Sequence, residues 1–133
     1  MSRQMSVGLA FFVLLAAGCA GLSRVGDEPL GPMPAHGPVY VDSADIIQLE
    51  SFPVRVMLEV KGQLPNPCHT AVWRVADPTA DGRIDVTLSS QAPQDQVCIQ
   101  MVKPVVLRIP LGSFTQGSYS VWLNGQLVGE FAL

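Results

Sequence analysis

The sequence predicts an all-β domain over residues 39–133, built as an antiparallel sandwich of seven or eight strands. Apolar residues of this region recur at every second position, which is the period of a strand with one buried face. Glycine, proline, asparagine and aspartate separate the apolar segments at intervals of roughly ten residues, as turns do in β-sandwiches. No segment of the region repeats with the period of an amphipathic helix.

The first half of the domain contains the clearest strand, over residues 53–61. Its apolar face consists of Val54, Val56, Leu58 and Val60. Residues 39–41 predict a shorter strand and residues 42–45 a turn, whereas residues 46–49 fit either a strand or one helical turn. Two prolines and a glycine predict a loop over residues 62–67.

The middle of the domain alternates between strands and polar connections. Residues 69–76 and 83–89 have the period of strands, and the segment between them, residues 77–82, contains the aspartate and glycine of a turn. A polar loop is predicted over residues 90–96.

The last third contains further strands. Residues 97–102 place Val97, Ile99 and Met101 on one face and predict a strand. Residues 105–111 predict another, and Pro110, which has no backbone donor, favours an edge or a bend there. A turn over residues 112–117 leads to the final hairpin.

The final hairpin admits two loops around Asn124-Gly125. A two-residue type I′ turn would pair Tyr119 with Glu130, so that the apolar face would meet polar residues. A three-residue loop over residues 123–125 pairs Val121 with Leu127 instead. It collects Tyr119, Leu127, Phe131 and Leu133 on one face. Because a slip of one residue exchanges the faces, the sequence favours the three-residue loop.

These features resemble known domains in two ways. The strand count and residues 117–121 resemble immunoglobulin-like domains. The wider pattern resembles small exported bacterial domains of uncharacterised function. That pattern comprises Leu64-Pro65, Cys68, Cys98, Ile109-Pro110-Leu111-Gly112 and Asn124-Gly125. The resemblance implies an immunoglobulin-like β-sandwich and no activity.

Residues 1–18 predict an export signal. Arg3 precedes an apolar segment over residues 7–17, and small residues then lead to Cys19. The apolar segment is shorter than the about 20 residues that span a bilayer. The sequence Ala17-Gly18-Cys19 resembles the lipobox of bacterial lipoproteins.

The lipobox resemblance implies lipidation of Cys19 and cleavage before it. Ala20 is not the aspartate that retains such proteins in the inner membrane, which implies the outer membrane in a cell with two membranes. Residues 19–38 would then be a lipidated, flexible linker, because residues 20–38 contain four glycines and four prolines without hydrophobic period.

Cleavage would leave two cysteines, Cys68 and Cys98. Export to an oxidising compartment favours a disulfide between them, and two buried free thiols are the alternative. The mature chain would lose Arg3 and keep seven Lys or Arg against eleven Asp or Glu, a net charge of −4. This charge disfavours binding to nucleic acid phosphates.

Two segments contain residues that could support chemistry. Residues 77–85 place carboxylates and a glycine as calcium-binding loops do, but the twelfth position is Leu88, which has no oxygen ligand. A hairpin turn is the favoured interpretation. Cys68-His69 resembles a thiol with its base, yet neighbouring residues of a strand point to opposite faces. The sequence predicts no catalytic residue, no metal ligand and no cofactor.

These observations predict a non-enzymatic binding or structural module of the bacterial cell envelope. Its expected partners are membrane lipid, through the acylated Cys19, and an envelope protein that contacts its loops or an exposed Trp73 or Trp122. The alternative function is a tethered protease inhibitor. It would present the loop from Gly62 to Pro67 beside Cys68, since a rigid loop loses little freedom on binding.

Overall fold

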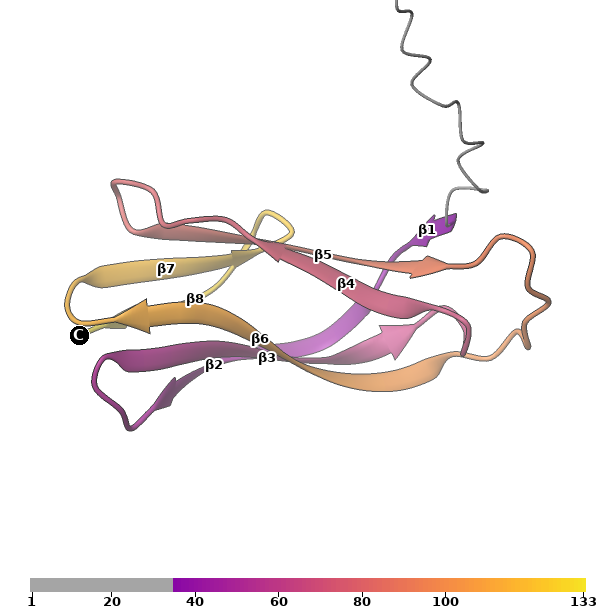
Figure 1. The fold of residues 1–133 in the computed structure, drawn as a ribbon, viewed down its shortest axis with the longest axis horizontal. Coiled ribbons are helices and arrows are strands. Elements are labelled where there is room, and N and C mark those ends of the chain that lie inside the picture. Colours follow the sequence, from indigo (N-terminus) through magenta and orange to yellow (C-terminus); the bar gives the residue numbers. More distant parts are fainter. Residues whose placement is uncertain (1–34) are drawn as a thin grey trace, which may run out of the picture. The chain divides into compact units, whose positions relative to one another are not determined.

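The computed structural model describes residues 35–133, which form two stacked β-sheets (Figure 1). The predicted all-β sandwich is confirmed, because these residues contain eight strands and no helix, an arrangement consistent with the immunoglobulin-like class. The predicted signal over residues 1–18, the lipidation residue Cys19 and the linker up to residue 34 lie outside the described residues.

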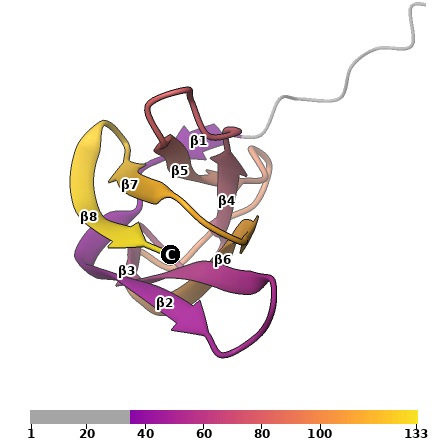
Figure 2. The ribbon, with the colours of Figure 1, turned by 90° about the vertical axis from the view of Figure 1, so that its left-hand side faces the viewer.

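Five strands form the first sheet and three form the second. The end-on view in Figure 2 shows the two layers. The first sheet contains β1 (Ala35–Gly37), β4 (Thr70–Val75), β5 (Arg83–Ala92), β7 (Ser118–Leu123) and β8 (Gln126–Ala132). The second sheet contains β2 (Tyr40–Leu49), β3 (Val54–Leu64) and β6 (Lys103–Phe114). Strand β6 is an edge strand, as Pro110 predicted.

The core lies between the two sheets. The inward face of β3 carries the valines and leucines that the sequence predicted, and the alternating residues of β5 face them from the other sheet. The fully buried side chains are Val56, Leu58, Val60, Ile84, Val86, Ser90, Ile109 and Val121. Alternation of apolar and polar residues therefore identified the buried faces of both central strands correctly.

Strand β5 is the centre of the first sheet because three strands pair with it. Strand β4 lies along one edge. The other edge is shared by β7, which pairs with residues 83–86, and β1, which pairs with residues 90–92. Asn124 bridges the gap between them. Its Oδ1 accepts from the Leu88 N–H at 2.8 Å and its Nδ2 donates to the Leu88 carbonyl at 3.0 Å, as a neighbouring strand would.

One strand pair departs from the predicted antiparallel sandwich. Strands β5 and β7 run parallel. The chain leaves β5, crosses to the second sheet as β6 and returns as β7, so that β5 and β7 have the same direction. Parallel neighbours require such a crossover. The period of two determines which residues face inward but not which strand becomes the neighbour.

Several strands extend further than predicted. The turn predicted over residues 42–45 is wrong, because these residues belong to β2, which absorbs one extra residue at an irregularity between Val41 and Ser43. Their polar side chains fit an edge strand exposed to water. Residues 90–92 belong to β5 instead of a loop. Strand β1 lies within the segment assigned to the linker.

The final hairpin has the two-residue loop, so the predicted three-residue loop is wrong. Asn124 and Gly125 have φ of 49° and 81°, which is the left-handed conformation of a type I′ turn. The conflict between faces is resolved further along, where β8 contains an extra residue: Trp122 pairs with Leu127 and Val121 with Gly129. The bulge restores the pairing of Tyr119 with Phe131, at a ring separation of 5.1 Å.

Two glycines provide a matched test of a close backbone contact. Gly82 and Gly125 have φ of 77° and 81°, but a Cβ at Gly82 would collide with the Ser118 carbonyl oxygen, whereas a Cβ at Gly125 meets nothing within 4 Å. We expect Gly125→Ala to lower the free energy of unfolding by about 1 kcal/mol and Gly82→Ala by roughly 2 kcal/mol. Urea denaturation measures both losses. Equal losses would contradict the close approach of the turn to β7.

Candidate functional site

The candidate functional site is the connection between β5 and β6, residues 93–102, which we call the disulfide loop. The strand predicted over residues 97–102 is wrong, because these residues are irregular and pair with no neighbouring strand. A hydrogen bond from the Met101 N–H to the Ile99 carbonyl, at 3.0 Å, closes a local turn. The residues that were expected to face a core therefore occupy a surface loop.

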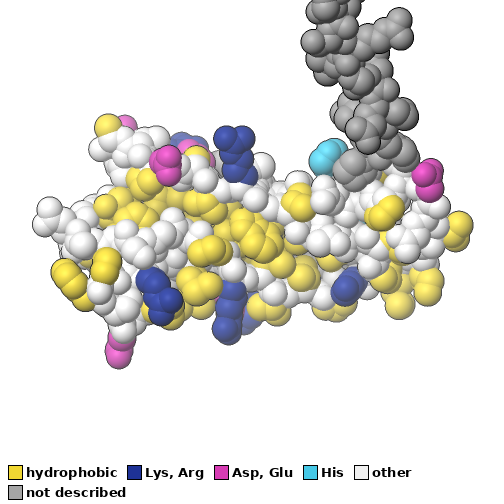
Figure 3. Space-filling model, viewed as in Figure 1, with side chains coloured by type: hydrophobic (Ala, Val, Ile, Leu, Met, Phe, Trp, Pro, Cys, Tyr) yellow, Lys and Arg dark blue, Asp and Glu magenta, His cyan; other side chains and the backbone are white. Residues whose placement is uncertain are grey.

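The disulfide loop exposes four large apolar side chains. The exposed fractions are 99% for Val97, 71% for Ile99, 60% for Met101 and 50% for Val102. Figure 3 shows exposed apolar side chains, in yellow, at the right-hand end of the sandwich, where Figure 1 places this loop, as well as along its middle. Contiguous exposed apolar side chains mark surfaces that contact a protein or a membrane.

The predicted disulfide between Cys68 and Cys98 fixes the orientation of the loop. Its two Cα atoms are 6.0 Å apart, and it joins the β3–β4 connection to the β5–β6 connection. Cys98 is partly buried because it points to the domain. Val97 and Ile99, on either side of Cys98, are exposed, so their side chains point away from the domain.

A small polar network supports the base of the loop. The buried hydroxyl of Ser90 donates to the Pro38 carbonyl at 2.9 Å and lies 2.8 Å from Nδ1 of His69. Since the single hydroxyl proton is used, Nδ1 must be the donor to Ser90. The thiol–base arrangement of Cys68 and His69 is therefore not formed. The sulfur is oxidised in the disulfide and the ring bonds to Ser90.

The loop predicted from Gly62 to Pro67 is shorter than expected. Residues 62–64 continue β3 and pair with residues 103–105 of β6, and Leu64 is buried in the core. Only the segment between Leu64 and Thr70 connects the strands. The structure thus presents less of a protruding loop than the inhibitor hypothesis required.

The turn predicted over residues 77–82 is confirmed, and the Asp85 carboxylate that follows it forms an ion pair with Arg83. The N–H of Thr79 donates to the Arg83 carbonyl at 2.9 Å, which closes the turn. Arg83 binds Asp85 through Nε and Nη2 at 2.8–3.0 Å, and its guanidinium lies 4.1 Å from the Trp122 ring centroid. Within residues 35–133 no three metal-ligating side chains form a cluster.

The ion pair provides a pH-dependent prediction. The hydrogen bond from Arg83 lowers the pKa of Asp85 from its ordinary value of 3.8. We expect the Asp85 carboxyl to titrate below that value by NMR, and Arg83→Gln to move the midpoint back towards it. The contribution of the pair to stability is present above about pH 4 and is lost as the pH falls through the lowered pKa. An unchanged midpoint in Arg83→Gln would contradict the pairing.

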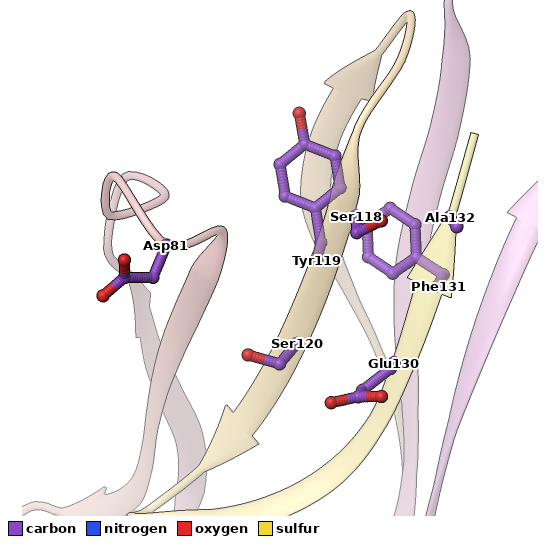
Figure 4. Close-up of a pocket in the computed structure, with 7 residues that line it drawn as sticks. All are labelled: Asp81, Ser118, Tyr119, Ser120, Glu130, Phe131 and Ala132. Carbon is purple, nitrogen blue, oxygen red and sulfur yellow. The ribbon is translucent and has the colours of Figure 1, made fainter.

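A shallow pocket of about 350 Å³ lies at the opposite end of the sandwich (Figure 4). It is lined by Asp81, Ser118, Tyr119, Ser120, Glu130, Phe131 and Ala132. Phe114 packs against Tyr119 with ring centroids 4.6 Å apart, and the Tyr119 hydroxyl donates to the Gln116 carbonyl at 3.0 Å. Two carboxylates and three hydroxyls line the pocket and suit hydrogen bonding to a small polar group, without a paired nucleophile and base.

The two tryptophans predicted as contact residues differ in exposure. Trp73 lies on β4 and is 44% exposed. Trp122 is partly covered by Arg83, and its Nε1 donates to the Ser120 hydroxyl at 3.1 Å. The described part of the chain, residues 35–133, contains no helix with the length and hydrophobicity to span a membrane.

Comparisons with known proteins agree with the architecture. The ORF11 beta-sandwich domain family matches residues 58–133, a segment that contains both cysteines of the disulfide and the whole disulfide loop. A relative from Herpetosiphon aurantiacus, "Uncharacterized 10.2 kDa protein in HgiCIIM 5'region", is 27% identical over 88 residues, which cover 65% of this chain and 92% of that protein. No solved structure matches the chain.

Proposed function

We propose that this chain, which belongs to the ORF11 beta-sandwich domain family, is a non-catalytic binding module of the bacterial cell envelope, held there by a lipid on Cys19. The observation that carries the proposal is the disulfide loop, whose apolar side chains are exposed to solvent and whose backbone is fixed to the domain by the disulfide. A contact surface of this kind loses little freedom on binding.

Two observations support the envelope location. The first 19 residues have the charge, apolar segment and small-residue junction of an exported lipoprotein. The disulfide between Cys68 and Cys98 fits an oxidising compartment, since disulfides seldom persist in the cytosol. The net negative charge of the chain offers little attraction to anionic lipids, so attachment would depend on acylation.

Acyl labelling in the expressing bacterium tests the anchor. We expect the wild-type chain to incorporate labelled fatty acid and to sediment with membranes, and Cys19→Ala to do neither. A variant that combines Cys68→Ser and Cys98→Ser is the matched control, because it should keep the label. Membrane attachment of Cys19→Ala would contradict the anchor.

Photo-crosslinking tests the binding surface. A photoreactive residue in place of Ile99 should form adducts in the native membrane, whereas the same residue in place of Phe52, another highly exposed apolar position, should form none. Adducts at both positions or at neither would contradict a specific contact through the disulfide loop.

A further inference from the structure

We infer that the disulfide loop seats Val97, Ile99 and Met101 in the lipid surface to which the chain is anchored. The inference rests on the proposed function, because it requires the lipid on Cys19. It names the partner of the loop: the interfacial region of a bilayer, where headgroups meet acyl chains. The argument depends on where the chain enters the sandwich, on the chemistry of the loop and on the high local concentration that an anchor imposes.

The chain enters the sandwich beside the disulfide loop. Ala35, the first described residue, pairs with Ala92, the last residue of β5, and the loop begins at the next residue, Pro93. Figure 1 shows β1 at the same end of the sandwich as the β5–β6 connection. A tether that arrives through β1 is therefore attached at the end that carries the exposed apolar side chains.

The length of the tether favours this end over the opposite one. Residues 20–34 separate Cys19 from Ala35. As a coil such a segment spans about 22 Å on average, and at most roughly 55 Å when extended. Strand β5 has 10 residues, so the opposite end lies about 33 Å further along the strand. The disulfide loop is thus the part of the sandwich held nearest the anchor.

The chemistry of the loop suits the lipid interface. Residues 97–102 contain no charged residue, and their polar side chain, Gln100, is uncharged. Burial of this segment therefore desolvates no charge. The disulfide turns Cys98 inward and leaves its neighbours pointing outward, so the apolar side chains are already presented before contact.

Contact of the disulfide loop with the bilayer would add to the attachment through Cys19, because the anchor raises the local concentration of the loop at the membrane. Once Cys19 is in the bilayer, the loop meets the same surface at high local concentration, so a few aliphatic side chains suffice. The acidic chain offers no basic cluster to contact lipid headgroups, so the apolar loop is the part of the domain suited to that second contact.

Depth-dependent quenching tests the inference with the full, acylated chain. The protein is purified from the expressing bacterium with Trp73→Phe and Trp122→Phe, so that a single reporter can be placed. Ile99→Trp reports on the disulfide loop. Phe52→Trp is the matched control, because Phe52 is 87% exposed and lies just before β3, at the end of the sandwich opposite the disulfide loop. At that end Val54 pairs with Phe114, whereas Leu64 at the other end pairs with Lys103, the residue that follows the loop.

Each variant is reconstituted in phosphatidylethanolamine–phosphatidylglycerol vesicles with plain or brominated acyl chains. We expect brominated chains to quench Ile99→Trp at least about twofold more than Phe52→Trp, as for a side chain about 5–10 Å into the interface. Emission from Ile99→Trp should also shift to the blue. Mass spectrometry without reduction confirms the disulfide in both variants. If Ile99→Trp fails to form it, Val97→Trp takes its place.

The outcomes separate the inference from the proposed function. Equal quenching at both positions, with the protein still on the vesicles, overturns the lipid contact and leaves the anchor intact. A blue shift at position 99 without bromine quenching also overturns it, because a protein surface or a second copy then covers the loop. Failure of the chain to associate with vesicles refutes the anchor and the inference together.

Discussion

Replacement of both Cys68 and Cys98 by serine is expected to lower the free energy of unfolding by about 3.7 kcal/mol. The two cysteines are 30 residues apart in sequence, so the disulfide closes a long loop of the unfolded chain and removes conformations from it. Domains of this size have net stabilities of about 5–15 kcal/mol, so the loss would be a large share of the total.

Urea denaturation of the double variant and the wild type measures this loss. Reduction of the wild type with dithiothreitol is the control, because it removes the same bond without changing the sequence. The two treatments should shift the midpoint by similar amounts. A double variant with the wild-type midpoint would show that the disulfide only orients the loop and does not stabilise the sandwich.

Leu58→Ala is expected to destabilise the sandwich by about 2–5 kcal/mol. Leu58 is fully buried at the centre of β3 and pairs with Ile109, which is also fully buried. Truncation removes apolar contacts and leaves a cavity between two sheets that are held apart by the remaining side chains. The measurement is chemical denaturation, with the dependence on denaturant concentration expected to stay unchanged.

Val106→Ala is the matched control for Leu58→Ala. It shortens an aliphatic side chain on β6, the strand that pairs with β3, but Val106 is 60% exposed. We expect a change within about 0.5 kcal/mol. A similar loss in both variants would contradict the assignment of the buried face.

The period of two was sufficient for the strands that form the core. From Val56 to Val60 in β3 and from Ile84 to Leu88 in β5 every second residue is apolar and buried, so the sequence predicted both strands and their inward faces. It failed for β2, whose central residues are polar because the strand lies at an edge. The sequence pattern also could not predict which strands are neighbours, since the parallel pairing of β5 with β7 depends on the crossover through β6.

The candidate site was predicted only in part. The two cysteines were sufficient to predict the disulfide, which the structure confirms. The alternation of Val97, Ile99 and Met101 was mistaken for a buried strand, because a period of two shows that side chains share a side and not what covers that side. The polar loop before them and Pro104 after them were the available signals of an unpaired segment.

The final hairpin shows how a local conflict was resolved at an unexpected place. The sequence correctly required that Tyr119 and Phe131 share a face, but assigned the extra residue to the turn. The structure places it in β8, beside Val121 and Trp122, and keeps the type I′ turn that Asn124-Gly125 favours. The bulge therefore allows both the type I′ turn and a shared face for Tyr119 and Phe131.

The Asn124 side-chain amide, which bridges the gap between β7 and β1, is also the group of this hairpin that can deamidate. When glycine follows asparagine, the glycine nitrogen attacks the side-chain carbonyl carbon, ammonia leaves, and water opens the cyclic imide to aspartate or isoaspartate. In Asn124 both amide atoms are bonded to Leu88, so the attack requires those bonds to break first. Deamidation to aspartate would set a carboxylate oxygen against the Leu88 carbonyl, and two acceptors would then face each other where the sheet edge is now joined.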